Sequence, residues 1–146
     1  MNPADLERLL SSIRIGELSV SDGLRELSAP PVHDLGHTRL DSHRALRCGH
    51  PEVVYGAGKT PEQLAEISSA LAKDHGSLLV TRASAEGAAA VCEVLPNAVH
   101  HPASGCITLE LPPEDAGEGL VLIICAGTSD RPVAEEAAIT ARLLGA

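Results

Sequence analysis

Apolar residues recur at intervals of three and four along four stretches of the chain, the spacing that gathers side chains on one face of an α-helix. We expect helices that begin near residues 3, 20, 61 and 85, each with a buried apolar stripe. The inward positions are Leu6, Leu9, Leu10 and Ile13 in the first helix, Leu24 and Leu27 in the second, Leu64, Ile67 and Leu71 in the third, and Ala88, Val91, Cys92 and Leu95 in the fourth.

Residues that cap helices stand at these expected starts. Asn2 precedes a proline, Ser84 precedes the fourth stripe, and Thr60 is followed three residues later by Gln63, the pairing of a capping box. Gly16 is suited to end the first helix. The prolines after Ala29 end the second helix, because proline disfavours helix for the residue before it.

Short apolar runs between these helices predict strands. They cover residues 34–41, 51–55, 77–81, 98–101 and 106–110, while residues 42–47 are predicted to be helical or turned. Strands that alternate with helices favour a parallel or mixed sheet, so the predicted fold class is α/β.

The last apolar run, residues 120–126, meets a small polar turn and then a helical pattern from about Pro132. This order predicts a buried parallel strand, a ligand-facing loop and the helix after it. Ligands bind beyond the carboxyl ends of parallel strands, and the free N–H groups at a helix start favour an anion such as phosphate. Ser129 adds a hydroxyl and Asp130 can accept hydrogen bonds from a ribose, or either residue only caps the helix. The candidate phosphate and ribose site comprises Gly127, Thr128, Ser129 and Asp130.

The chain is therefore expected to contain an α/β domain with a helical N-terminal appendage at 1–110, a linker rich in Pro, Gly and acidic residues at 111–118, and a βα unit at 119–146. One βα unit cannot bury its own strand, so we expect 119–146 to be the start of an incomplete parallel-sheet domain. Alone, it should leave an exposed apolar patch.

Composition narrows the classes of function. With one Tyr and no Phe or Trp, aromatic stacking sites for bases are nearly excluded. A net charge of −9 and a pI near 5.1 argue against a nucleic-acid surface. The longest apolar run falls short of the about 20 residues of a membrane-spanning helix. The first residues lack the regions of a signal peptide, so the expected location is cytoplasmic.

The four cysteines are widely spaced. No two of them form a CxxC pair, which excludes zinc-ribbon and thioredoxin-like motifs. We expect them to be buried free thiols that pack as small apolar side chains. They are Cys48, Cys92, Cys106 and Cys125.

Two stretches carry a resemblance to a known family. The run AGTSDRPVAEEA at 126–137 resembles the opening motif of PurE-type domains, the aminoimidazole ribonucleotide carboxylase superfamily. The run DSHRALRCGHPEVVYGAGKTPEQ at 41–63 resembles the N-terminal domain of the LarB family, PurE-like carboxylases/hydrolases of nickel-pincer nucleotide cofactor biosynthesis. The resemblance implies a flavodoxin- or Rossmann-like parallel sheet after the first domain, and a homo-oligomer.

The resemblance also implies a reaction. Nicotinic acid adenine dinucleotide is carboxylated at C5 of its pyridinium ring by CO2 or bicarbonate, with Mg²⁺ as an implied cofactor, and its phosphoanhydride is hydrolysed. The products are the biscarboxylated mononucleotide and AMP. In the family a cysteine adds covalently to the ring, and none of the four cysteines here matches its position. We therefore expect this chain alone to be an inactive fragment. The alternatives are a non-catalytic nucleotide-binding or regulatory module, or one half of a split carboxylase.

Further positive charges could contact the phosphates of a dinucleotide. Lys59 follows a glycine turn, and Arg44 and Arg47 lie in the 41–63 stretch. Lysine and arginine both pair well with phosphate. Asp41, in the same stretch, is a candidate substrate contact.

Three other patterns carry less weight. The segment GAGKT at 56–60 has a valine where a Walker A loop has its first glycine, so a glycine turn and a helix cap are favoured. His33 and His37 would meet at a metal only on a helix, which the glycine between them disfavours, so no metal site is predicted. Glu135 and Glu136 suit the start of a helix, where carboxylates interact well with the helix dipole.

Overall fold

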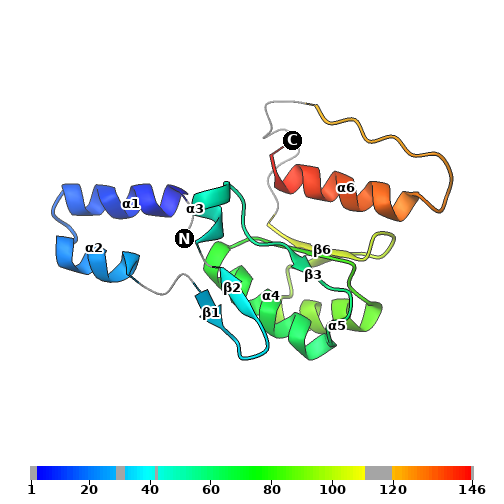
Figure 1. The fold of residues 1–146 in the computed structure, drawn as a ribbon, viewed down its shortest axis with the longest axis horizontal. Coiled ribbons are helices and arrows are strands. Elements are labelled where there is room, and N and C mark those ends of the chain that lie inside the picture. Colours follow the sequence, from blue (N-terminus) through cyan, green and yellow to red (C-terminus); the bar gives the residue numbers. More distant parts are fainter. Residues whose placement is uncertain (1–2, 29–31, 42, 111–119, 146) are drawn as a thin grey trace. The chain divides into compact units, whose positions relative to one another are not determined.

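The computed structural model describes residues 3–28, 32–41, 43–110 and 120–145 (Figure 1). The chain divides into two compact units, Met1–Pro51 and Glu52–Ala146. Helices and strands alternate along most of the chain, which confirms the predicted α/β class. The predicted linker at 111–118 lies outside the described residues. Among the residues that are described, no helix is both long and apolar enough to span a membrane.

The first unit combines helices with a small hairpin. Its described elements are α1 (Pro3–Arg14), α2 (Val20–Leu27), β1 (Val32–Asp34), β2 (Arg39–Asp41) and α3 (Arg44–Cys48). The first two confirm the predicted helices, and α3 confirms the helical alternative for residues 42–47.

The helices α1 and α2 meet at a glycine. A Cβ atom added at Gly23 would lie only 2.4 Å from Cδ1 of Ile13, so α1 fits against α2 where α2 has no side chain. The prediction that Leu24 and Leu27 point inward is wrong, because both side chains are exposed. The periodicity of apolar residues correctly predicted the helix α2 but not which of its faces packs against α1. The two helices approach closely at Gly23, because this residue has no side chain, and not at the leucines.

Residues 34–41 do not form the single strand that was predicted: they contain the end of β1, a turn and β2. β1 pairs antiparallel with β2, and the turn between them is closed by a hydrogen bond from the Leu35 N–H to the Thr38 carbonyl. The Asp34 carboxylate accepts from the N–H of Gly36, whose φ of +80° suits glycine.

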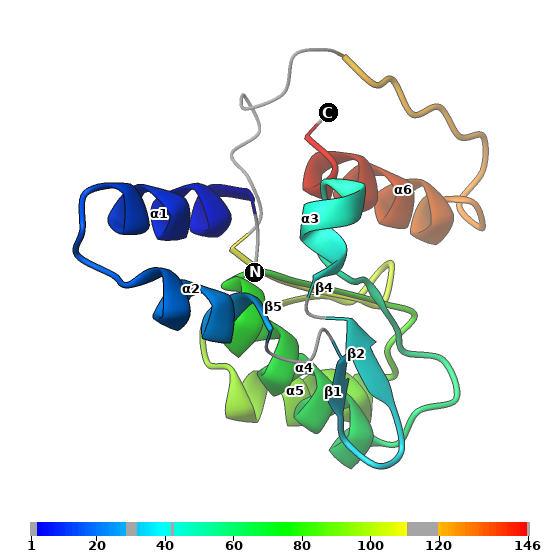
Figure 2. The same ribbon diagram turned by 60° about the vertical axis from the view of Figure 1, so that its left-hand side comes forward.

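The second unit is built on a mixed four-stranded sheet. Its described elements are β3 (Val54–Tyr55), α4 (Pro61–His75), β4 (Leu78–Thr81), α5 (Ala85–Val94), β5 (Val99–His101), β6 (Cys106–Leu109) and α6 (Arg131–Leu143). The strand order is β3-β4-β6-β5, with β3 parallel to β4 and the other pairs antiparallel. Figures 1 and 2 show α4 and α5 on one side of this sheet and α6 on the other.

The core of this unit follows the predicted stripes. Leu64, Ile67 and Leu71 of α4 are buried, as is Val91 of α5, and all four residues of β4 are buried. A strand between helical layers has no solvent-facing side, which explains why the first three residues of β4 are apolar without interruption. The capping box predicted at the start of α4 is also present.

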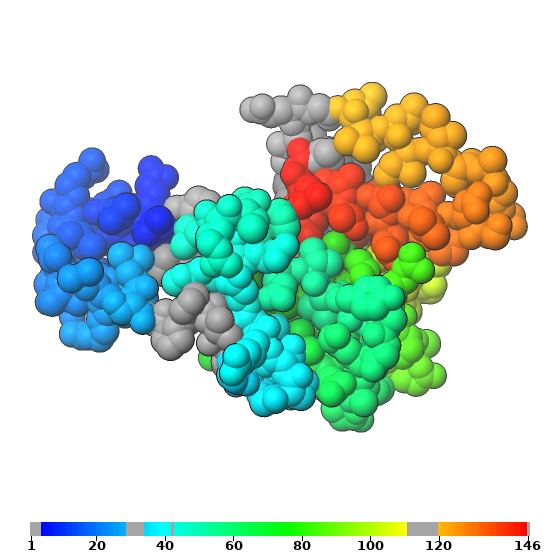
Figure 3. Space-filling model, in the orientation of Figure 1, coloured from blue at the N-terminus to red at the C-terminus, as the bar shows by residue number. Residues whose placement is uncertain are grey.

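Residues 120–126 form no strand, contrary to the prediction. Leu120, Leu122 and Ile124 are 92%, 75% and 81% exposed, and Figure 3 shows this segment at the surface, in yellow-orange. A strand is held by hydrogen bonds to a neighbouring strand, and no described strand pairs with this segment. These large apolar side chains are exposed, as was expected of the segment, although they do not belong to a strand.

The cysteines differ from the prediction that all are buried. Only Cys106 is buried, Cys92 is half-buried, and Cys48 and Cys125 are exposed. Cys125 was assigned a packing role as part of the predicted strand at 120–126. Because that strand is absent, its thiol has no apolar layer to pack against.

Candidate functional site

The loops that follow the parallel strands β3 and β4 meet at the carboxyl-terminal ends of these strands. The N–H of Gly56, just after β3, donates to the carbonyl of Thr81 at the end of β4, over 2.7 Å. A Cβ at Gly56 would lie 2.9 Å from that carbonyl oxygen and 3.0 Å from the Cα of Ala83. The first residue of the glycine turn is therefore pressed against backbone, and only glycine fits there.

The turn at 56–60 ends in a helix cap. The N–H of Lys59 donates to the carbonyl of Gly56, and Gly58 has a φ of +79°. The Thr60 hydroxyl accepts from the N–H of Gln63, and the Gln63 side chain accepts from the N–H of Thr60. This geometry supports the glycine turn and capping box over a Walker A loop. The side chain of Lys59 is half-buried.

Arg82 follows β4 directly and makes a contact that sequence reasoning missed. Its Nε donates to Oε2 of Glu136 on α6 over 2.5 Å, and this hydrogen bond raises the pKa of the guanidinium. From the sequence, Glu136 was interpreted only as a carboxylate that suits the start of a helix. Instead it joins α6 to the end of β4, across 54 positions of sequence. No local pattern encodes such a pair.

The predicted phosphate loop is accessible. Gly127, Thr128, Ser129 and Asp130 are all exposed, and the N–H of Asp130 donates to the Gly127 carbonyl over 3.4 Å. Asp130 is the N-cap residue of α6, yet its side chain makes no capping hydrogen bond. The corresponding residues of α4 and α5, Thr60 and Ser84, both do. The carboxylate of Asp130 is thus not used to hold its own helix.

Two of the three candidate substrate contacts of the first unit, Asp41 and Arg47, pair with each other. The Asp41 carboxylate pairs with Arg47 and accepts from the His43 N–H over 3.1 Å. The hydrogen bond from Arg47 is the main reason that the pKa of Asp41 is lowered. Arg44 is half-buried, and its Nε is buried without a hydrogen-bond partner. Asp41, Arg44 and Arg47 belong to the first unit, whereas Lys59 and the phosphate loop belong to the second.

Metal ligands are not gathered in the described part of the chain, where no group of three His, Cys, Asp or Glu side chains could hold an ion. His101 instead makes a hydrogen bond of 2.9 Å between its Nε2 and the Thr108 hydroxyl.

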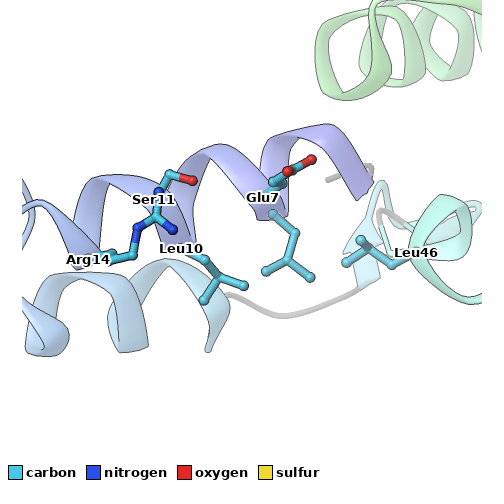
Figure 4. Close-up of a pocket in the computed structure, with 6 residues that line it drawn as sticks. Glu7, Leu10, Ser11, Arg14 and Leu46 are labelled. Carbon is cyan, nitrogen blue, oxygen red and sulfur yellow. The ribbon is translucent and has the colours of Figure 1, made fainter.

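A cavity of about 470 Å³ lies along α1 in the first unit (Figure 4). Leucines and polar side chains share its lining, and Leu46 comes from α3. None of the predicted site residues lines this cavity, so it does not coincide with the place where the sequence predicts the chemistry. The lining residues are Leu6, Glu7, Leu10, Ser11, Arg14 and Leu46.

Comparison with known proteins identifies the family. An uncharacterized protein of Methanocaldococcus jannaschii is 29% identical to this chain over 97% of the chain and 58% of its own length. The chain thus spans somewhat more than half of the curated relative that it matches. Residues 32–112, more than half of the chain, match the family described as LarB/PurE-like N-terminal domain. The chain belongs to the LarB/PurE-like N-terminal domain family.

Proposed function

We propose that this chain carries the N-terminal domain and the first nucleotide-binding loop of a LarB-type carboxylase/hydrolase. The family match supports the class of enzyme. The observation that carries the assignment of the loop is Asp130, an exposed carboxylate at a helix start that makes no capping bond. A ribose hydroxyl can donate to it while the N–H groups of the first turn of α6 receive a phosphate.

The proposed substrate is nicotinic acid adenine dinucleotide. Carboxylation forms a carbon–carbon bond between C5 of the pyridinium ring and CO2, and the C5 proton leaves. Hydrolysis adds water across the phosphoanhydride and releases AMP. The other product is the biscarboxylated mononucleotide, whose ribose and phosphate are the groups that the loop at 127–130 is proposed to hold.

Mg²⁺ fits this proposal as an ion carried chiefly by the phosphate oxygens of the substrate. It prefers several oxygen ligands and usually keeps several of its waters, which substrate phosphates allow. The described residues supply no protein cage for it. The protein's own contribution is positive charge, and Lys59 is the proposed phosphate contact in the second unit. Assembly into a homo-oligomer is part of the same proposal.

Binding and turnover can be measured separately. The purified chain is titrated with nicotinic acid adenine dinucleotide by calorimetry, and is then incubated with that compound, bicarbonate and Mg²⁺ while AMP is followed by mass spectrometry. We expect binding that weakens about tenfold in Asp130→Ala, the loss of roughly one charge-assisted hydrogen bond. The matched control is Glu135→Gln on the same helix, which should bind as the parent does.

Turnover by this chain is not expected, since none of its four cysteines matches the position of the covalent catalyst in the family. Formation of AMP together with the biscarboxylated product would refute that expectation and establish the activity directly. Equal binding by the parent and Asp130→Ala would refute the assignment of the loop.

A second candidate is a non-catalytic nucleotide-binding module, which the same exposed and uncommitted loop would serve. This second hypothesis predicts that the chain binds AMP as tightly as it binds the dinucleotide, because such a module would not recognise the pyridinium ring. A split enzyme predicts turnover only after a second polypeptide is added.

A further inference from the structure

Arg82 stands in a backbone conformation that is uncommon for its residue type. Its φ is +54°, in the left-handed region that favours glycine. Such a conformation costs energy and persists only where the surrounding structure holds it. Here the conformation comes directly after the buried strand β4, and the side chain reaches Glu136 of α6.

The helix α6 is attached to the sheet unevenly. Leu143 is 7% exposed and packs with Leu79 and Cys106, and Ile139 adds a half-buried contact to the same cluster. Near the other end of α6, Val133 is 55% exposed. The apolar contacts therefore hold the half of the helix that is distant from the phosphate loop.

Glu136 lies on the same face of the helix as Ile139 and Leu143, because residues three and four apart are neighbours on a helix. The pair of Glu136 with Arg82 lies nearer in sequence to the loop at 127–130 than the apolar contacts of Ile139 and Leu143 do. The Glu136 side chain is 22% exposed and that of Arg82 47%, so the pair is partly shielded from solvent.

We propose that Arg82 is a positioning residue that acts through Glu136 to fix the start of α6, and with it the orientation of the Gly127–Asp130 loop. The inference rests on the proposed function of that loop as a phosphate and ribose site. It assigns Arg82 a role in placing the loop and not in contacting the reacting atoms.

The first test needs no ligand. Hydrogen exchange is measured on the full chain for the amides of residues 134–138, where Ala134 donates to the Asp130 carbonyl over 2.9 Å. We expect Arg82→Gln and Glu136→Gln each to exchange about two- to fivefold faster, the range that corresponds to a partly exposed ion pair. Glu135→Gln, the matched control, should leave the rates unchanged. Unchanged rates in both test variants would overturn the proposal.

The reversed pair separates positioning from general loss of structure. In the double variant Arg82→Glu/Glu136→Arg the two charges attract again, so exchange at 134–138 should return toward the parent rate. If the double variant exchanges as fast as the single variants, attraction between these residues does not fix the helix, and the proposal fails.

The second test uses nicotinic acid mononucleotide, which has the ribose and single phosphate that the loop is proposed to hold. Its Kd should rise about two- to fivefold in Arg82→Gln and recover in the reversed pair, while the Tm of each variant is recorded beside it. A parent chain that does not bind the mononucleotide would refute the proposed function, while the exchange test still decides the positioning role. A parent chain that binds, with variants of equal affinity, would overturn the positioning proposal alone.

Discussion

The packing of α4 against α5 can be tested sharply by mutation. Both helices begin near the carboxyl-terminal ends of β3 and β4, where Lys59 also lies, so their packing supports this part of the candidate site. Leu64 of α4 is 1% exposed and lies directly over Gly87 of α5. A Cβ at Gly87 would be 2.6 Å from Cδ1 of Leu64 and 3.4 Å from the Ser84 hydroxyl oxygen. The glycine thus makes room for the leucine.

The magnitudes follow from this geometry. Gly87→Ala should gain about 1 kcal/mol in helix propensity and lose about 1–3 kcal/mol by overpacking, a net loss of roughly 0–2 kcal/mol. Leu64→Ala should cost about 2–5 kcal/mol through lost burial and the cavity that remains. In the double variant the new methyl group at position 87 enters that cavity. The two substitutions should therefore couple favourably by about 1–3 kcal/mol.

The assay is urea unfolding followed by far-UV circular dichroism, since the chain has no Trp and its single Tyr is exposed. The control cycle pairs Leu64→Ala with Ala89→Gly at an exposed position of α5, and its effects should add within about 0.5 kcal/mol. If the Leu64–Gly87 cycle were equally additive, the leucine would not occupy the space that the glycine leaves.

Three other outcomes are expected. Gly56→Ala should lower the free energy of unfolding by about 1–3 kcal/mol, because its Cβ would meet backbone atoms that cannot rotate away; an unchanged urea midpoint would contradict this. The pKa of Asp41 is lowered, mainly by the hydrogen bond from Arg47, so its stabilising effect is present above the ordinary pKa of about 3.9 and is lost as pH falls through the lowered value. The stability curves of the parent and Asp41→Asn should therefore converge in acid. Burial raises the pKa of Cys106, so a thiol reagent should label the exposed Cys125 at once and Cys106 only on unfolding, as peptide mass spectrometry would show.

The sequence predicts the elements of this fold where the determining interactions are local. The stripe of Leu64, Ile67 and Leu71 and the Thr60–Gln63 capping box all lie within one helix, and the structure contains them as expected. The alternation of such helices with short apolar strands likewise predicts a parallel or mixed sheet, and the observed sheet is mixed. Each of these features depends on residues a few positions apart.

The features that sequence reasoning missed depend on residues far apart. Glu136 read alone is an ordinary glutamate at a helix start, and only the packing of α6 against the sheet brings it to Arg82. The burial of Gly23 in place of Leu24 also depends on which face meets α1. Periodicity gives the faces of a helix but not the surface that each face will meet.

The segment at 120–126 shows the limit of pattern more directly. A run of seven apolar residues predicts a buried strand, but a strand becomes stable only when neighbouring backbone satisfies its N–H and C=O groups. The described sheet is completed by β3, β4, β6 and β5, and none of these pairs with the segment. Most of its side chains, including that of Ile124 at 81% exposure, consequently lie in solvent just before the loop that is proposed to bind phosphate. If a partner strand supplied those hydrogen bonds, the same residues would suit a buried core strand. The prediction therefore failed because the partner strand is not among the described strands, and not because these residues disfavour a strand.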